Sequence, residues 1–325
     1  MGLSRVFEVF RSLIFLLFIL NYPLASVAQD IPVDTEKWAL VWADEFEGST
    51  LDLSKWSYNV DCWGGGNNER QCYTDRQENV AVDNGILKIK AIKEKYRGPA
   101  FPPHMQDTPE RAEKTKKRKF TSGRIVTKNK GDWTYGRFDI RAKMPTGQGT
   151  WPAIWMLPTD NVYGGWAASG EIDIMEAVNL GAKCGACANG IEDQVHGTIH
   201  FGGEWPDNRY SGEAVTLPNA IDDWHVYSVV WSAGVITWYV DGEPYARRTL
   251  EYWKSNNPEM QDQILAPFDQ RFHMILNLAI GGNWPESEND KGVDKSGFPK
   301  TMEVDYVRVY QCISDPELGL DCVSF

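Results

Sequence analysis

The chain has 325 residues, of which 42% are hydrophobic and 24% charged, and its formal net charge at pH 7 is −12. A chain of this length can bury a large core. Its acidic balance makes nucleic acid and anionic membranes poor partners, whereas sulfated glycans are disfavoured only weakly.

The N-terminus has the pattern of a secretory signal peptide. Arg5 and Arg11 stand beside a short apolar block, and a small-residue cleavage site ends at Ala28. The block is too short to span a bilayer, which takes about 20 apolar residues. We expect residues 1–28 to be removed and residues 29–325 to form a single domain that is secreted, extracellular, monomeric and free of the membrane.

Short segments rich in β-branched and aromatic residues recur through the rest of the chain, with Gly, Pro, Asn and Asp between them. Such segments predict strands, and Asp241-Gly242 predicts a hairpin turn. One short helix is expected near residues 258–264. The expected strands are 40–46, 86–92, 121–127, 135–144, 151–157, 171–178, 195–201, 224–231, 235–240, 272–280 and 302–310. Many short strands predict an all-β sandwich.

The six cysteines of this exported chain predict disulfides. Their clustering favours local pairs, namely Cys62–Cys72, Cys184–Cys187 and Cys312–Cys322. Cys184 and Cys187 also have the C-x-x-C spacing of redox and zinc sites. No second such pair accompanies them, so a disulfide that closes a loop is the favoured interpretation.

Residues 98–119 interrupt the strand pattern with four prolines and a basic run at 114–119. A basic run can bind polyanions. Because the rest of the chain is acidic, a solvated loop tip is the favoured interpretation.

Glu171, Asp173 and Glu176 place three carboxylates in one predicted strand. Carboxylates so close together repel one another unless they share protons, so the cluster indicates chemistry. Because strand residues alternate between faces, Glu176 joins the other two acids only if the strand contains a β-bulge at Ile174 or Met175. Retaining glycosidases use two carboxyl groups about 5–5.5 Å apart. The alternative is a solvated edge strand with a chance acidic pattern.

Aromatic residues and histidines surround the acidic strand in the sequence. Among 14 tryptophans, Trp151, Trp155 and Trp284 are predicted to stack on the apolar faces of sugar rings. His196 and His200 share one face of the following strand. They would lie about 13 Å apart, too far to chelate one metal ion, so a carboxylate or a sugar is the expected partner of an imidazole there.

Together these segments resemble glycoside hydrolase family 16, and most closely its laminarinase-type endo-β-1,3-glucanases. The match follows the family's order over essentially the whole mature chain. It rests on Trp42-Ala-Asp-Glu-Phe46, Asn67-Asn-Glu69, Tyr73-Thr74, Thr121-Ser-Gly-Arg-Ile125, Trp151-Pro-Ala-Ile-Trp-Met156, Glu171-Ile-Asp-Ile-Met-Glu176, His196-Gly-Thr-Ile-His200, Gly281-Gly-Asn-Trp-Pro285 and Val304-Asp-Tyr-Val-Arg-Val-Tyr310.

The resemblance implies a jelly-roll of two curved antiparallel sheets with a substrate cleft across the concave face. It implies that Glu171 is the nucleophile, Glu176 the acid/base and Asp173 their modulator, in a retaining hydrolase whose partner is β-1,3-glucan. The predicted substrate-binding residues are Trp151, Trp155, Trp166, His196, Arg124, Asn67, Asn68, Glu69, Asn283 and Trp284. The loops at 98–119 and 184–193 depart from the family pattern and are expected to border the cleft.

The resemblance implies no cofactor for catalysis but a structural calcium far from the cleft. Its ligands would be the carbonyls of Glu45 and Gly85 and the side chain of Asp305. Two alternatives remain open. One is a β-glucan recognition protein that binds without cutting, and the other is a hydrolase of mixed-linkage glucan or of a galactan.

Overall fold

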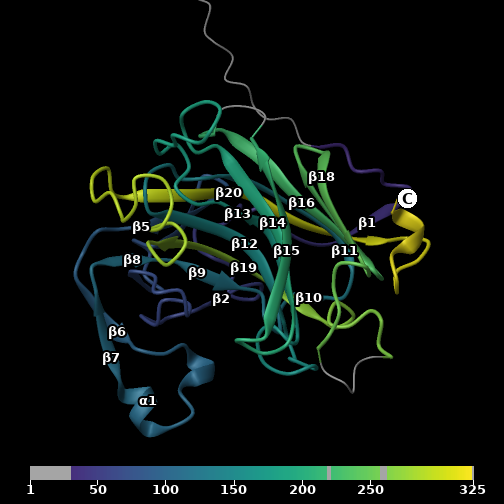
Figure 1. Ribbon diagram of the computed structural model, residues 1–325, viewed down its shortest axis with the longest axis horizontal. Coiled ribbons are helices and arrows are strands. Elements are labelled where there is room, and N and C mark those ends of the chain that lie inside the picture. Colours follow the sequence, from purple (N-terminus) through teal and green to yellow (C-terminus); the bar gives the residue numbers. More distant parts are fainter. Residues whose placement is uncertain (1–30, 218–220, 257–261, 324–325) are drawn as a thin grey trace, which may run out of the picture.

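The computed structural model describes residues 31–217, 221–256 and 262–323. Two large antiparallel sheets pack face to face as a jelly-roll β-sandwich (Figure 1), which confirms the predicted fold class. The predicted signal peptide, residues 1–28, lies outside the described residues. In the described ranges, no helix has the length and apolar character needed to cross a membrane.

The first sheet has eight strands in the order β18-β17-β16-β11-β20-β5-β4, with β1 also paired to β20. Its strands are β1 (Trp38–Asp44), β4 (Val80–Asp83), β5 (Ile86–Ala91), β11 (Gly136–Lys143), β16 (Trp224–Ser232), β17 (Val235–Val240), β18 (Glu243–Thr249) and β20 (Lys300–Cys312). Pairing of β1 with β20 joins the two ends of the described chain in one sheet.

The second sheet also has eight strands, in the order β15-β14-β13-β12-β19-β9-β2, with β10 paired to β19. Its strands are β2 (Ser57–Tyr58), β9 (Arg124–Val126), β10 (Asp132–Trp133), β12 (Thr150–Pro158), β13 (Glu171–Glu176), β14 (Gln194–Gly202), β15 (Asn208–Thr216) and β19 (Phe272–Ile280). The acidic strand β13 therefore lies inside the sheet, between β12 and β14, which excludes the solvated edge strand.

Most predicted strands are present, and the differences have local causes. The segment 121–127 is divided at Gly123 into β8 (Phe120–Ser122), which pairs in parallel with β3 (Gln71–Tyr73), and β9. A Cβ atom on Gly123 would lie 2.3 Å from a methyl of Val80, so only glycine fits where the chain passes so close. Strand β15 was not predicted, because its sequence at the sheet edge is polar and largely exposed. Residues 257–261 of the expected helix lie outside the described residues, and residues 262–264 are not helical.

The segment 98–119 is solvated at residues 107–117, as the sequence favoured, but it is a hairpin with regular structure and not a loop. Strands β6 (Tyr96–Pro99) and β7 (Thr115–Arg118) form an antiparallel hairpin. Its tip contains the 3-10 helix η1 (Pro103–Met105) and the helix α1 (Pro109–Glu113), whose N-cap Thr108 accepts a hydrogen bond from the Arg111 backbone. In this two-stranded hairpin both faces are open to solvent, so the charged side chains of β7 stay hydrated. A basic run can therefore form a regular strand here.

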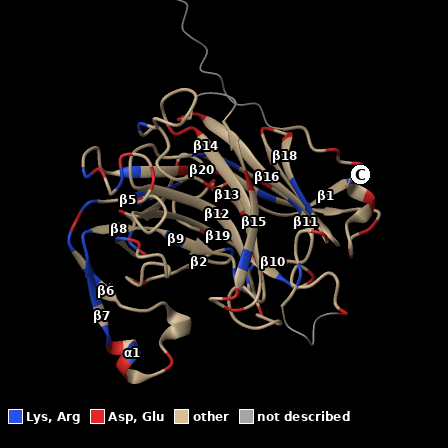
Figure 2. Cartoon of the chain, in the orientation of Figure 1, with Lys and Arg blue, Asp and Glu red and all other residues tan. Residues whose placement is uncertain are grey.

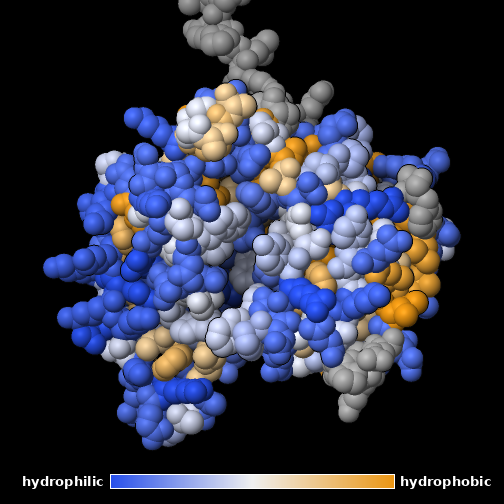
Figure 3. All heavy atoms as spheres, in the orientation of Figure 1, coloured by the Kyte–Doolittle hydropathy of each residue, from blue (hydrophilic) through white to orange (hydrophobic). Residues whose placement is uncertain are grey.

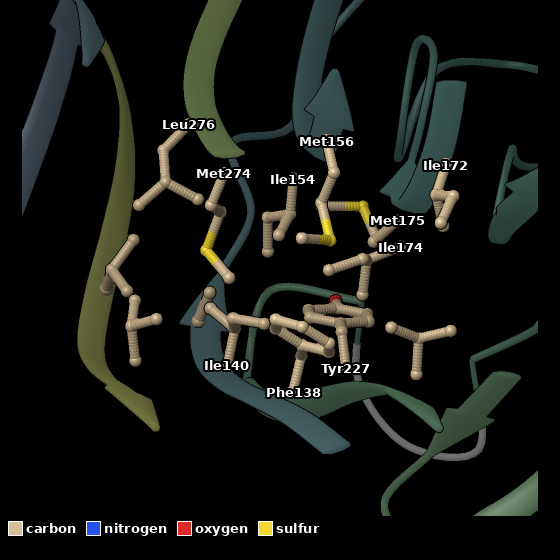
Figure 4. Packing of buried hydrophobic residues seen from close by; sticks show 14 of the residues in the cluster. Phe138, Ile140, Ile154, Met156, Ile172, Ile174, Met175, Tyr227, Met274 and Leu276 are labelled. Atoms are coloured by element: carbon tan, nitrogen blue, oxygen red, sulfur yellow. The ribbon is translucent and has the colours of Figure 1, made fainter. Parts of the chain in front are cut away.

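The main core lies between the two sheets. Ile172, Ile174 and Met175 of β13 point toward Phe138 and Tyr227 of the first sheet (Figure 4), and all five side chains are almost fully buried. Burying an aliphatic side chain of this size stabilises the fold by about 1.5–3 kcal/mol. This packing anchors the inner face of β13 while its other face carries the acids.

The three local disulfides are confirmed. The structure joins Cys62 to Cys72, Cys184 to Cys187 and Cys312 to Cys322. The C-x-x-C pair therefore closes a loop, and its sulfurs are not available as thiolate ligands for a metal ion.

Strand β13 contains the predicted bulge. The partners of Glu171, Asp173 and Glu176 on β14 follow one another at intervals of two residues, although three steps separate Asp173 from Glu176. On the other side, Met175 pairs with Ile154 of β12 and Asp173 pairs with the next residue, Trp155. Ile174 has no partner on β12 and is therefore the extra residue of the bulge. Because residues two apart on β14 share a face, their three acidic partners share it as well.

We predict that deleting Met175 lowers the Tm less than inserting an alanine after it. The deletion gives Glu-Ile-Asp-Ile-Glu, in which plain alternation keeps the second glutamate on the face of the first. The insertion must either enlarge the bulge or shift that glutamate by two residues, about 6.6 Å along the strand. Calorimetric unfolding of both variants measures the difference. A milder effect of the insertion would contradict this account of the bulge.

Candidate active site

The strand register gathers the acids on the outer face of the second sheet. Glu171 lies opposite His200, and Glu176 lies opposite His196. Asp173, between them, lies opposite Trp155 of β12 and is 1% exposed. The molecular surface is mostly hydrophilic on the side shown in Figure 3 and is hollowed near its middle, where Figure 1 shows β12 and β19.

Each glutamate accepts a hydrogen bond from its own indole. Trp166 Nε1 donates to Glu171 Oε2 at 2.8 Å, and Trp151 Nε1 donates to Glu176 Oε1 at 3.0 Å. These bonds fix two carboxyl groups whose remaining oxygen atoms are available for a substrate. Trp151 and Trp166 therefore position the acids, in addition to the binding role predicted for them.

Two histidines complete the two sides of the site. His200 Nε2 lies 3.3 Å from Asp173 Oδ2 and 3.7 Å from Glu171 Oε1. On the other side, the His196 ring packs edge-on against Trp284, with ring centroids 5.0 Å apart, and Trp284 packs against Trp151 at 5.5 Å. His200 therefore faces carboxylates, as expected for one of the imidazoles, whereas His196 faces an aromatic ring that was not predicted as its partner.

A hydrogen-bonded network supports Trp155 from beneath. Trp155 Nε1 donates to Asn277 Oδ1 at 2.6 Å, and Asn277 Nδ2 donates to the Tyr73 hydroxyl at 3.2 Å. The Tyr73 hydroxyl donates in turn to Glu69 Oε2. Glu69 is 6% exposed, so the structure places it under the cleft floor. The Arg124 guanidinium stacks on the Trp155 ring at 4.8 Å, and its Nε has no hydrogen-bond partner among the described residues.

The predicted asparagines lie together at the side of the site near Trp284. Asn68 Nδ2 donates to Asn283 Oδ1 at 2.8 Å, and the Asn283 backbone donates to the Asn67 carbonyl at 2.8 Å. All three asparagines are exposed. Their amide groups are therefore accessible to sugar hydroxyls.

The sequence interpretation missed two residues of this face. Asn277 is a single amide in the apolar run of β19, and that isolation was a usable signal for a functional position. Tyr210 is 74% exposed and lies near the His200 ring, with centroids 5.9 Å apart. It belongs to β15, the edge strand that the sequence did not predict.

Hollows at both sides of the acids make the site an open cleft. One, of about 350 Å³, lies beside Asn68 and Asn283. The other, of about 640 Å³, is lined by Gly203 and Glu204, which bond to the loop that carries Trp166. A chain-like ligand can therefore extend past the acids in both directions.

Burial raises the pKa of all three acids. Burial, with the Asp173 charge as the next cause, raises the pKa of Glu171 to about 8. Burial raises the pKa of Asp173 well above its usual range, and burial likewise raises the pKa of Glu176. Three charges cannot be held here together, so the cluster shares protons near neutral pH.

Hydrogen bonding decides where the remaining negative charge is best stabilised. The Asp173 charge raises the pKa of Glu171, so the two neighbouring carboxyl groups are not both ionised near neutral pH. Glu171 also accepts the Trp166 N–H and faces His200. Because the pKa of Glu171 is about 8, the form that can attack a sugar, with Glu171 ionised and Asp173 and Glu176 protonated, is a minority form at neutral pH.

The predicted calcium ligands come together in the first sheet. Strand β1 ends and β5 begins against the same side of β20, so Glu45 and Gly85 flank Asp305. Two carbonyls and a carboxylate are oxygen donors that suit calcium, and these residues would hold it structurally. The Asp305 carboxylate also pairs with Arg141, which competes for the same oxygen atoms.

The fold and the paired glutamates define the protein as a glycoside hydrolase of the jelly-roll type. Residues 38–312 match the family model described as "Beta-porphyranase A-D, GH16 domain". The chain belongs to glycoside hydrolase family 16.

Relatives within this family include glucanases. The chain is 44% identical over 287 residues to a glucan endo-1,3-beta-glucosidase A1 of Niallia circulans. The aligned region covers 84% of this chain but only 38% of that relative. It is 40% identical to a beta-glucanase of Rhodothermus marinus, over 96% of this chain and 99% of the relative. The solved laminarinase from Rhodothermus marinus matches with a TM-score of 0.66 and 41% identity, over 85% of this chain and 98% of that chain.

We predict that Glu171→Gln stabilises the folded protein at neutral and alkaline pH. The pKa of Glu171 in the folded protein, about 8, lies above the ordinary value of 4.5 for a glutamate. Between these values the folded state binds more protons than the unfolded state. The free energy of unfolding therefore falls as pH rises, by up to about 1.4 kcal/mol per pH unit for one proton. Glutamine does not ionise, so the Glu171→Gln protein does not lose this part of its free energy of unfolding as pH rises.

Calorimetry from pH 4.5 to pH 8 measures the effect. The Tm of Glu171→Gln minus that of the wild type should grow with pH across this window. The exposed Glu317→Gln is the matched control and should follow the wild type. A Tm difference for Glu171→Gln that does not change with pH would contradict the assignment of a raised pKa to Glu171.

Proposed function

We propose that the protein is a secreted endo-β-1,3-glucan hydrolase that acts by retaining double displacement. The observation that supports this most directly is the bulge at Ile174, which aligns Glu171 and Glu176 on one face with an indole bonded to each. The glucanase relatives support β-1,3-glucan as the substrate class. The open cleft supports attack within a chain instead of at its end.

In the first step, the Glu171 carboxylate attacks the anomeric carbon of the sugar bound next to it. Glu176 donates its proton to the leaving oxygen as the glycosidic bond breaks, so the leaving sugar departs as an alcohol. The product is a glycosyl ester on Glu171. Burial suits Glu176 to the role of acid, because it keeps this group protonated at a pH at which an exposed glutamate would be ionised.

In the second step, Glu176 acts as a base toward water. It takes a proton from the water molecule that attacks the anomeric carbon, and the ester bond to Glu171 breaks. A protonated Asp173 does not repel Glu171 when Glu171 carries a full charge. Two carboxyl groups and water supply all the chemistry of this cycle, so no cofactor takes part.

The surroundings of the acids suit a neutral glucan. Trp151, Trp155, Trp166 and Trp284 offer ring faces for sugar C–H groups, and the amides of Asn68 and Asn283 offer hydrogen bonds to hydroxyls. A recognition protein that binds without cutting would have no use for three buried acids that destabilise the fold. A galactan substrate, which the description of the family model suggests, is tested against glucan below.

We further propose that the mature protein is extracellular and acts as a monomer. The signal-like N-terminus supports export, and three disulfides suit an oxidising compartment.

Reducing-end release from laminarin, curdlan, lichenan and agarose tests the substrate and the nucleophile together. We expect laminarin to be cleaved fastest, and Glu171→Gln to lower kcat by several orders of magnitude, on the order of 10⁴-fold or more, because no ester can form. The variant should still bind laminarin. Binding of laminarin without release by the wild type, unchanged by Glu171→Gln, would establish a recognition protein instead.

Azide rescue tests the acid/base role of Glu176. Glu176→Ala should slow substrates with poor leaving groups most, since they depend on its proton. With an activated aryl glycoside, azide should restore part of the turnover and yield the β-glycosyl azide, because azide needs no general base. An α-azide product, or an equal loss on all leaving groups, would show that the roles are assigned wrongly.

A further inference from the structure

A basic pocket lies at the side of the cleft next to Glu176. The hollow of about 350 Å³ is lined by the cationic side chains of Arg70, Lys116 and Arg118, by the carboxylate of Glu286, and by uncharged residues, namely Asn68, Gly282, Asn283 and Ser287. A Cβ atom on Gly282 would lie 3.2 Å from the Trp151 ring, so the pocket begins where the tryptophan floor ends. A glycan that stacks on that floor would reach the pocket at its next sugar units.

Two of the three cations of this pocket, Lys116 and Arg118, are not neutralised by a carboxylate within it. Arg70 is fully paired, because its guanidinium forms two hydrogen bonds to the Glu286 carboxylate, at 2.6 and 2.9 Å. Arg118 donates only to the backbone carbonyls of Cys62 and Trp63, both at 3.1 Å. In the part of the chain that the structure describes, neither Lys116 nor Arg118 forms an ion pair.

The local electrostatics favour a bound anion. Burial and then the Arg118 charge lower the pKa of Lys116, and burial and then the Arg70 charge lower the pKa of Arg118. Asp61 and Glu69 lie behind Arg118 and offset part of its charge, but burial raises the pKa of both acids. An anion in the pocket would relieve repulsion among the cations that the protein itself leaves uncompensated.

The β6–β7 hairpin supplies the free cations. Most of β7 has the blue colour of Lys and Arg in Figure 2. Because residues alternate along a strand, Lys116 and Arg118 share one face of β7, and Lys117 lies on the other. One face of β7, with Lys116 and Arg118, therefore lines the cleft, and the opposite face, with Lys117, does not.

We propose that this pocket is a subsite for an anionic substituent on the glycan, a sulfate ester or a uronate carboxylate. The proposal rests on the proposed function, because the pocket extends the hydrolytic cleft. Arginine and lysine form charge-assisted hydrogen bonds with both kinds of group. With a net charge of −12, the chain as a whole repels polyanions, so a local basic pocket is needed for such a substituent to bind.

Calorimetric titration of the Glu171→Gln protein tests the subsite without turnover. The ligands are neutral laminari-oligosaccharides and the same oligosaccharides carrying either sulfate esters or C6 carboxylates. We expect at least one charged series to bind more tightly than the neutral one. Adding Lys116→Glu should lower the ratio of charged to neutral affinity about tenfold, as expected for loss of one charge-assisted contact.

Lys117→Glu is the matched control, because it makes the same charge change on the opposite face of β7. It should leave the ratio unchanged, and circular dichroism should show that both variants are folded. A preference for sulfate or for carboxylate identifies the substituent. Equal affinity for neutral and charged ligands, or equal effects of the two substitutions, would overturn the proposal.

The test of the anionic subsite and the test of the proposed hydrolysis can fail independently. If the wild type cleaves laminarin but shows no preference for charged ligands, only the anionic subsite fails. If charged ligands bind as expected but no β-1,3-glucan is cleaved, the subsite stands and the proposed hydrolysis fails.

Discussion

The alternation of side chains along a strand is the constraint on which the site depends. Glu171 and Glu176 are five residues apart, and in a regular strand they would lie on opposite faces. Glu176 would then enter the apolar layer between the sheets, where an ionised carboxylate is heavily penalised. The bulge at Ile174 removes this conflict and turns Ile174 and Met175 together toward the core. One extra residue thus allows a single strand to carry both reactive groups.

The position of β13 in the middle of the sheet has a cost and a benefit. Neighbouring strands and tryptophans bury Asp173 and cover much of Glu171 and Glu176, and this burial raises the pKa of all three acids. The same burial keeps a proton on Glu176. It also limits the number of negative charges in the cluster, and the indole N–H groups of Trp166 and Trp151 stabilise the charge that remains. Core packing of Ile172 and its neighbours offsets the cost, as is common where function requires strained electrostatics.

Much of this arrangement could be predicted from the sequence, because it follows from local rules. Parity alone predicted the bulge, and cysteine clustering predicted the disulfides. The β6–β7 hairpin could not be predicted, because a run of lysines is equally compatible with solvation and with a paired ribbon until the partner strand is known. The Trp166 and Trp151 bonds to the acids, and the Asn277 network, depend on distances between strands that no single segment encodes.

Trapping of the covalent intermediate tests the central claim, that the bulge places a nucleophile and a separate acid on one face. A 2-deoxy-2-fluoro-β-laminaribiosyl fluoride should form an ester that hydrolyses slowly, and peptide mass mapping should locate the label. The account predicts a single modified residue, Glu171, in the wild type and no label in Glu171→Gln. A label on Glu176 or Asp173, or turnover of this substrate through inverted product without any ester, would contradict it.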